Sequence, residues 1–169
     1  GVQTCALPIS SLIWKQVPLE KRKQAAEAFW KDQSAEQIEA IGAIAQRLKF
    51  RPKSVAVLPF ERKVQYLIGL PAVPENVAAA LLVAYHFAHQ RQLMGAFMDA
   101  LGVPHEEGLI KEDATLPNEA EKLQSAVKAI AAAFPAEDVA LYLSTLAWQD
   151  PDAWSMLSEL PETHLPPRT

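Results

Sequence analysis

The chain has 169 residues, of which half are hydrophobic, and its net charge is −4. A chain of this length buries roughly 68–70% of its unfolded surface in one domain, so neither disulfides nor a structural metal is needed for stability. No apolar run approaches the roughly 18 residues that span a bilayer, so no membrane partner is expected.

The charge is divided unevenly along the chain. Residues 10–70 hold 11 Lys and Arg against 6 Asp and Glu, whereas residues 71–169 hold 5 against 14. The first part is therefore basic, with a net charge of +5, and the second is acidic, with a net charge of −9.

Residues 1–9, GVQTCALPI, match the in-frame translation of a short-read sequencing adapter, and we interpret them as non-native. They contain the only cysteine, Cys5, so the remaining chain has no thiol for a disulfide or a metal. On this interpretation the native N-terminus and any targeting signal are missing. A cytoplasmic location is then the default expectation.

Proline-led motifs followed by an acid predict where helices begin, because proline fits the first helical turn and an acid suits the positive end of the helix dipole. Apolar residues between these motifs recur at helical three- and four-residue steps. Ser34 and Gln37 are spaced as a capping box. The motifs are VPLE (17–20), LPFE (58–61), VPE (73–75), LPNE (116–119), FPAE (134–137) and DPD (150–152).

These patterns predict an all-α protein, a single compact orthogonal bundle of seven or eight short helices. The domain is expected to cover residues 10–160, with a proline-rich and disordered tail over residues 161–169. The stripes lie in residues 38–48, 60–68, 77–88, 93–101, 123–134 and 139–146, and residues 102–116 are predicted to form a loop. The proline motifs have no fixed period, which excludes a repeat array.

The stretch IAQRLKFRPKSVAVL, residues 44–58, resembles the helix-turn-helix of bacterial DNA-binding domains. The resemblance implies that Phe50 packs inside and that Pro59 falls within the recognition helix. Lys49 stands at the turn position that usually holds glycine. The residues expected to contact DNA bases or phosphates are Arg47, Lys49, Arg51, Lys53 and Ser54. A solvated basic helix end is the alternative interpretation.

The histidines allow a second hypothesis. His86 and His89 are three residues apart on one helix, and His105 in the next loop would supply a third metal ligand. The alternative is that these histidines flank an apolar stripe and bond to carbonyls or carboxylates. Arg91 interrupts the apolar pattern, and if it is buried it is expected to pair with Asp99 or a loop acid.

No nucleophile elbow and no glycine-rich phosphate loop is present in the sequence, so an enzyme is not the expected class and no cofactor is expected. The favoured hypothesis is a protein-interaction or scaffolding module. A protein partner or self-association would follow from the charge division, since a basic part can contact the acidic part of a second copy. DNA binding through residues 44–58 and metal binding through the histidines are the alternatives.

Overall fold

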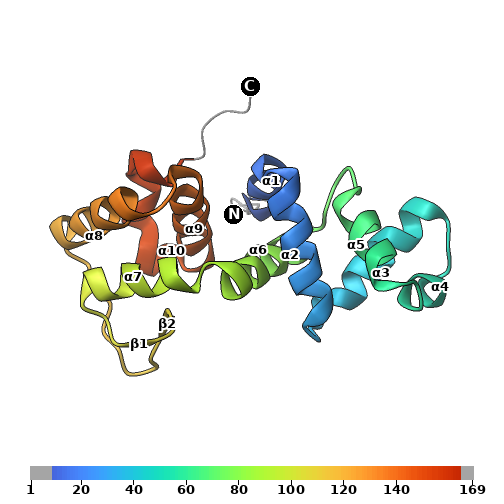
Figure 1. Ribbon diagram of the computed structural model, residues 1–169, viewed down its shortest axis with the longest axis horizontal. Helices are drawn as coiled ribbons and strands as arrows, with labels where there is room; N and C mark the ends of the chain where they lie inside the picture. Colours follow the sequence, from blue (N-terminus) through green and yellow to red (C-terminus); the bar gives the residue numbers. More distant parts are fainter. Residues whose placement is uncertain (1–8, 165–169) are drawn as a thin grey trace, which may run out of the picture. The chain divides into compact units, whose positions relative to one another are not determined.

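The computed structural model describes residues 9–164, and within this range the chain is predominantly helical (Figure 1). The predicted all-α fold class is confirmed. The described residues form ten α-helices and two 3-10 helices, more than the seven or eight expected, because short helical turns precede and follow the longer ones. The predicted stripes coincide with six of these helices, namely α3 (Glu36–Leu48), α5 (Phe60–Ile68), α6 (Glu75–His89), α7 (Arg91–Leu101), α8 (Ala120–Ala133) and α9 (Ala136–Gln149).

The remaining elements are short, apart from α2. They are α1 (Ile9–Gln16), α2 (Leu19–Lys31), α4 (Pro52–Ala56), α10 (Pro151–Trp154), and the 3-10 helices η1 (Ser155–Glu159) and η2 (Pro161–Thr163). The predicted loop contains a hairpin of β1 (His105–Glu106) and β2 (Leu109–Ile110), paired antiparallel. None of the helices in residues 9–164 combines the length and apolar character needed to cross a membrane.

Contacts between residues divide the chain into two compact units, unit 1 up to Tyr85 and unit 2 from His86. The sequence predicts one domain over residues 10–160, whereas this boundary falls inside α6. The charge division follows the boundary closely. Residues 1–85 hold 11 Lys and Arg against 7 Asp and Glu, and residues 86–169 hold 5 against 13.

Proline precedes several helices, but it occupies the N-cap position and not the predicted first helical position. Pro18, Pro59 and Pro135 are the N-cap residues of α2, α5 and α9, with φ of −59°, −56° and −57° and extended ψ. The fixed φ of proline suits this non-helical position as well as the first helical one. Pro151 alone among the six motifs occupies the first helical position, in α10.

The predicted capping box does not form. The N-cap of α3 is Ala35, without a side-chain hydrogen bond. The Gln37 side chain instead donates to the carbonyl oxygen of Phe29, at 2.8 Å, and to that of Asp32. It thereby satisfies carbonyls at the end of α2, which have no partner within their own helix.

Unit 1 is built around α2, which packs against α5, while α3 contacts both α4 and α5. At the start of unit 1, the backbone amides of Ser10 and Ser11 donate to the Glu75 carboxylate, at 2.6 and 3.0 Å. These are orphan donors of the first turn of α1, so an acid of α6 caps α1. The largest fully buried side chains of the unit are Phe29, Ile44, Leu67, Leu81 and Leu82.

Unit 2 has α7 between the hairpin and α8, and α9 packs against α10 and both 3-10 helices. Three aromatic rings meet in its core. Phe97 lies edge-on to Tyr142, with ring centroids 5.7 Å apart, and 5.9 Å from Trp154. The core consists of Leu93, Met94, Phe97, Met98, Leu101, Val103, Leu123, Ala126, Val127, Ile130, Val139, Tyr142, Leu143, Trp154 and Leu157.

The tail predicted to be disordered from residue 161 begins with folded residues. Pro161–Thr163 form η2, and Thr163 is buried. Its hydroxyl donates to the Leu157 carbonyl, and its own carbonyl accepts from the Ser144 hydroxyl at 2.6 Å. Packing of η2 against α9 therefore extends unit 2 beyond residue 160, and residues 165–169 lie outside the described residues.

Candidate functional site

A groove of about 520 Å³ lies between α2 and α5 in unit 1. Residues four apart on a helix share a face, so Phe60, Val64 and Ile68 line it from α5. Leu19, Lys23 and Glu27 line it from α2 with the same spacing. Its apolar part includes Leu19, which is 61% exposed, and Phe60, which is 38% exposed.

The polar side chains around this groove are mostly acidic. Glu20, Glu27 and Glu61 stand against one cation, Lys23, so the lining has a net charge of −2. Within residues 9–164, none of these three carboxylates forms an ion pair. The groove is thus acidic although the unit that carries it is basic.

Of the two helices that line this groove, the sequence predicted the apolar face of α5. The α5 stripe was visible as a helical repeat of apolar residues, which predicts burial. The exposure of Leu19 was not predicted, but its position directly after Pro18 places it in the first turn of α2, where few neighbours cover a side chain. Which helix lies beside α5 depends on long-range packing, and that is not written in local periodicity.

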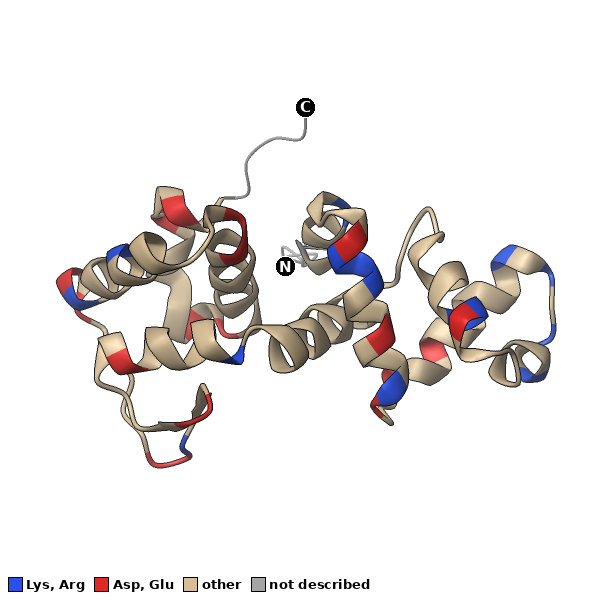
Figure 2. Ribbon diagram, in the orientation of Figure 1, with Lys and Arg blue, Asp and Glu red and all other residues tan. Residues whose placement is uncertain are grey.

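The second surface is the turn from α3 into α4, where the cations of the helix-turn-helix prediction gather (Figure 2). All five predicted contact residues are exposed: Arg47, Lys49, Arg51, Lys53 and Ser54. In the part of the chain that the structure describes, none of the four cations forms an ion pair with a carboxylate.

The helix-turn-helix resemblance holds in its core and fails in its second helix. Ile44 and Val55 are buried as expected, and α3 packs against α4. However, α4 has only five residues, and Pro59 is the N-cap of α5 and not part of a recognition helix. Phe50, expected inside, is 47% exposed.

The turn itself adopts the backbone that glycine usually supplies. Lys49 has φ of 58° and ψ of 37°, in the left-handed region. The amide of Phe50 donates to the Ala45 carbonyl at 2.9 Å, which closes the end of α3. A lysine here costs about 1 kcal/mol of backbone strain, which the surrounding hydrogen bonds offset.

The three histidines of the metal hypothesis are not brought together. His86 is buried with its ring 5.6 Å from that of Tyr142, whereas His89 is exposed on the same helix. His105 is engaged by Asp99 and Gly108. Over the described range 9–164, no group of three or more His, Cys, Asp or Glu side chains is placed to hold a metal ion.

Burial of Tyr142 makes the free energy of unfolding depend on pH. Burial raises the pKa of the Tyr142 hydroxyl well above its ordinary value. In the unfolded chain the hydroxyl ionises near about pH 10, so above that pH only the unfolded form releases this proton. The free energy of unfolding should therefore be unaffected by this group below pH ~10 and fall by about 1.4 kcal/mol per pH unit above it.

Substituting Tyr142→Phe is expected to remove that fall. The check is urea unfolding of both proteins at several pH values between about 9 and 11. Tyr66 and Tyr85 are present in both proteins, so their contributions cancel in the comparison. Equal slopes of stability against pH would show that Tyr142 ionises as readily in the folded protein as in the unfolded one.

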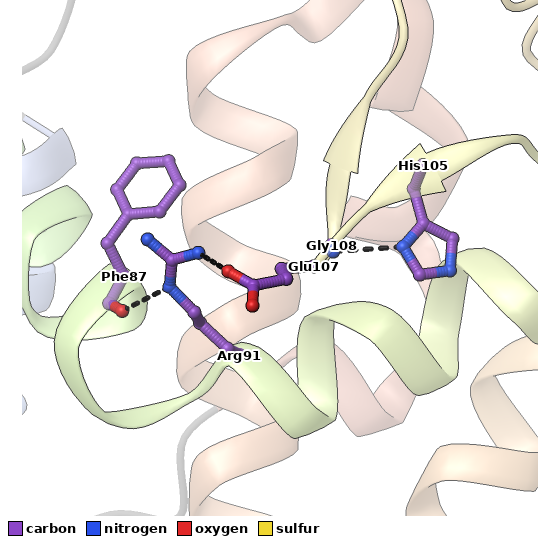
Figure 3. Close-up of polar contacts among 5 residues, drawn as sticks. All are labelled: Phe87, Arg91, His105, Glu107 and Gly108. Carbon is purple, nitrogen blue, oxygen red and sulfur yellow. Dashed lines mark hydrogen bonds and ion pairs between the residues drawn. The ribbon is translucent and has the colours of Figure 1, made fainter.

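The hairpin of unit 2 is held against α7 by polar contacts (Figure 3). Arg91 donates from Nε to the Phe87 carbonyl at 2.9 Å and forms an ion pair with Glu107. Its guanidinium also lies over the Phe87 ring, 5.7 Å from the centroid. Arg91 thus pairs with a loop acid, Glu107, although its side chain is exposed and not buried.

His105 makes the second contact of the hairpin. Its Nδ1 accepts from the Gly108 amide at 2.9 Å, and its Nε2 lies 2.6 Å from the Asp99 carboxylate. A backbone N–H can only donate, so Nε2 carries the proton shared with Asp99. The two-residue turn Glu107–Gly108 has φ of 51° and 89°, both positive as a type I′ hairpin turn requires.

Comparison with known proteins does not assign this chain to a group. No protein-family model matches it, and neither a curated protein nor a solved structure does.

Proposed function

We propose that this chain is a protein-interaction or scaffolding module and not an enzyme, and that it docks a partner helix in the groove between α2 and α5. The observation that carries the proposal is the exposed apolar lining of that groove together with its unpaired acidic rim. Soluble proteins place large apolar side chains in contact with water at a cost, and such side chains in a concave site are typical of binding surfaces.

The charge of the rim selects the partner's chemistry. A helix that fills a groove does so with apolar residues at three- and four-residue steps. Carboxylates of Glu20, Glu27 and Glu61 would then face the flanks of that helix. The fitting occupant is an amphipathic helix with an apolar stripe flanked by Lys and Arg, since like charges at the rim would oppose an acidic helix.

The test uses three synthetic helical peptides with one apolar stripe and with flanks of Lys and Arg, of Gln, or of Glu. Each is titrated into the isotope-labelled full chain while backbone amide shifts are followed. We expect the basic peptide to shift amides of α2 and α5 and to bind at least about tenfold more tightly than the acidic one.

A matched pair of variants locates the site. Leu19→Asp places a charge in the groove, whereas Leu12→Asp places the same charge on α1, where leucine is 51% exposed. We expect Leu19→Asp to weaken binding about tenfold or more and Leu12→Asp to leave it within about twofold, because only the first buries apolar surface with the peptide.

Three outcomes would contradict the proposal: no shift with any peptide, shifts outside α2 and α5, or equal effects of the two variants. The same samples also test a second copy of the chain as the occupant. Self-association through opposite charges would make the sedimentation coefficient fall as salt is raised. The apparent affinity for the peptide would then also depend on the concentration of the protein.

A further inference from the structure

The α3–α4 turn concentrates positive charge in an otherwise acidic chain. Residues 40–60 contain no Asp or Glu, and four of the seven residues from Arg47 to Lys53 are cations. All four are exposed, and none pairs with a carboxylate within residues 9–164. A local field of this kind attracts a polyanion even when the net charge of the whole chain is negative.

An aromatic ring lies in the middle of these cations. Phe50 stands between Lys49 and Arg51 and is 47% exposed. Its backbone is held in place by the hydrogen bond from its amide to the Ala45 carbonyl and by the left-handed conformation of Lys49. The ring is therefore presented to solvent from a closed helix end and not from a free loop.

The exposed cations and the exposed Phe50 ring together indicate which kind of polyanion fits this surface. Cations alone suit any phosphate backbone, whereas an exposed aromatic ring adds a stacking platform for an unpaired base. Reading the bases of a duplex with a helix-turn-helix would instead require a recognition helix in the major groove. With five residues, α4 is only about 7.5 Å long, too short to place several side chains on base edges.

We propose that the α3–α4 turn binds single-stranded nucleic acid without reading its sequence. Phe50 stacks on one unpaired base, and the guanidinium and ammonium groups of Arg47, Lys49, Arg51 and Lys53 contact the phosphates on either side. This site shares no residue with the α2–α5 groove, so either proposal can fail without the other.

The test is a fluorescence anisotropy titration of the full chain with labelled oligothymidine and oligouridine of about 15 nucleotides at low salt, beside a duplex of equal length. We expect both single strands to bind more tightly than the duplex. Phe50→Ala should weaken single-strand binding about 5- to 150-fold, and Phe50→Trp should preserve it. Leu109→Ala, which trims an equally exposed apolar side chain in unit 2, should have no effect.

The phosphate contacts are tested separately, by the salt dependence of the binding constant. For a single strand each contact contributes about −0.7 to the slope of log K against log salt. The double variant Lys49→Gln/Arg51→Gln should therefore reduce the slope by about 1.4, while Lys111→Gln/Lys128→Gln, which removes the same charge from unit 2, should leave it unchanged.

The proposal is overturned if no single strand binds at low salt at protein concentrations up to about 100 μM, because non-specific binding has a Kd of about 10⁻⁴ M or lower even at physiological salt. It is also overturned if the duplex binds as tightly as the single strand and Phe50→Ala has no effect, since the surface would then recognise charge alone. Binding to vesicles of anionic lipid without binding to either oligonucleotide would assign the surface to a membrane and would equally reject it.

Discussion

Alanine in place of Gly108 is expected to lower the free energy of unfolding of unit 2 by about 2–4 kcal/mol. A Cβ atom at this position would lie 2.4 Å from Cβ of Met94 and 3.1 Å from the Gly95 amide nitrogen. Neither neighbour can move away freely, because Met94 is buried in the core and Gly95 is part of α7. The φ of 89° adds backbone strain that any L side chain would feel.

Gly102→Ala is the matched control for this substitution. Gly102 also has a positive φ, 71°, but an added Cβ would meet no atom within 4 Å. It should therefore cost only the conformational part, about 1 kcal/mol. Both variants are compared with the parent by urea unfolding. Equal losses would mean that the hairpin moves away from α7 without cost, and the contacts of His105 and Arg91 would then contribute nothing measurable.

The largest single loss of stability is expected for Phe97→Ala, about 3–5 kcal/mol. The ring is completely buried and touches Tyr142 edge-on as well as Trp154. Its removal deletes apolar contact and leaves a cavity between side chains of three helices, which are fixed by their own packing. Since domains are stable by only about 5–15 kcal/mol, this substitution should bring unit 2 close to unfolding at room temperature.

Phe134→Ala provides the comparison. Phe134 packs against the same core but is only partly buried at the end of α8. Thermal and urea unfolding should show a distinctly smaller loss for Phe134→Ala than for Phe97→Ala. If the two losses were the same, the core would collapse around the missing Phe97 ring, and its packing would not be the tight one described above.

The helical class was predictable because it rests on local patterns. Apolar residues at three- and four-residue steps identified α3 and α5–α9, and proline followed by an acid located the starts of α2, α5, α6, α9 and α10 to within one or two residues. The short elements were missed. A five-residue helix such as α4 is too brief for periodicity, and the two-residue strands are too brief for alternation.

The surfaces were predictable only in part. The exposed cations from Arg47 to Lys53 were expected, since charged residues are rarely buried without a partner. The exposure of Phe50 was not, because an aromatic side chain is by itself a good candidate for a core. The different surroundings of the histidines were not predictable, because spacing along a helix does not show which residues face the core. Tertiary packing buried His86, whereas His89, three positions later, stayed exposed.

The bond between Glu75 and the amides of Ser10 and Ser11 has a consequence for synthesis on the ribosome. Helix α1 has eight residues, too few to be stable alone, and the acid that caps it is encoded 65 positions later. At about 5–20 residues per second, the growing chain waits roughly 3–13 s after making Ser10 before Glu75 is joined to it. Helix α1 thus remains uncapped until the start of α6 has been made.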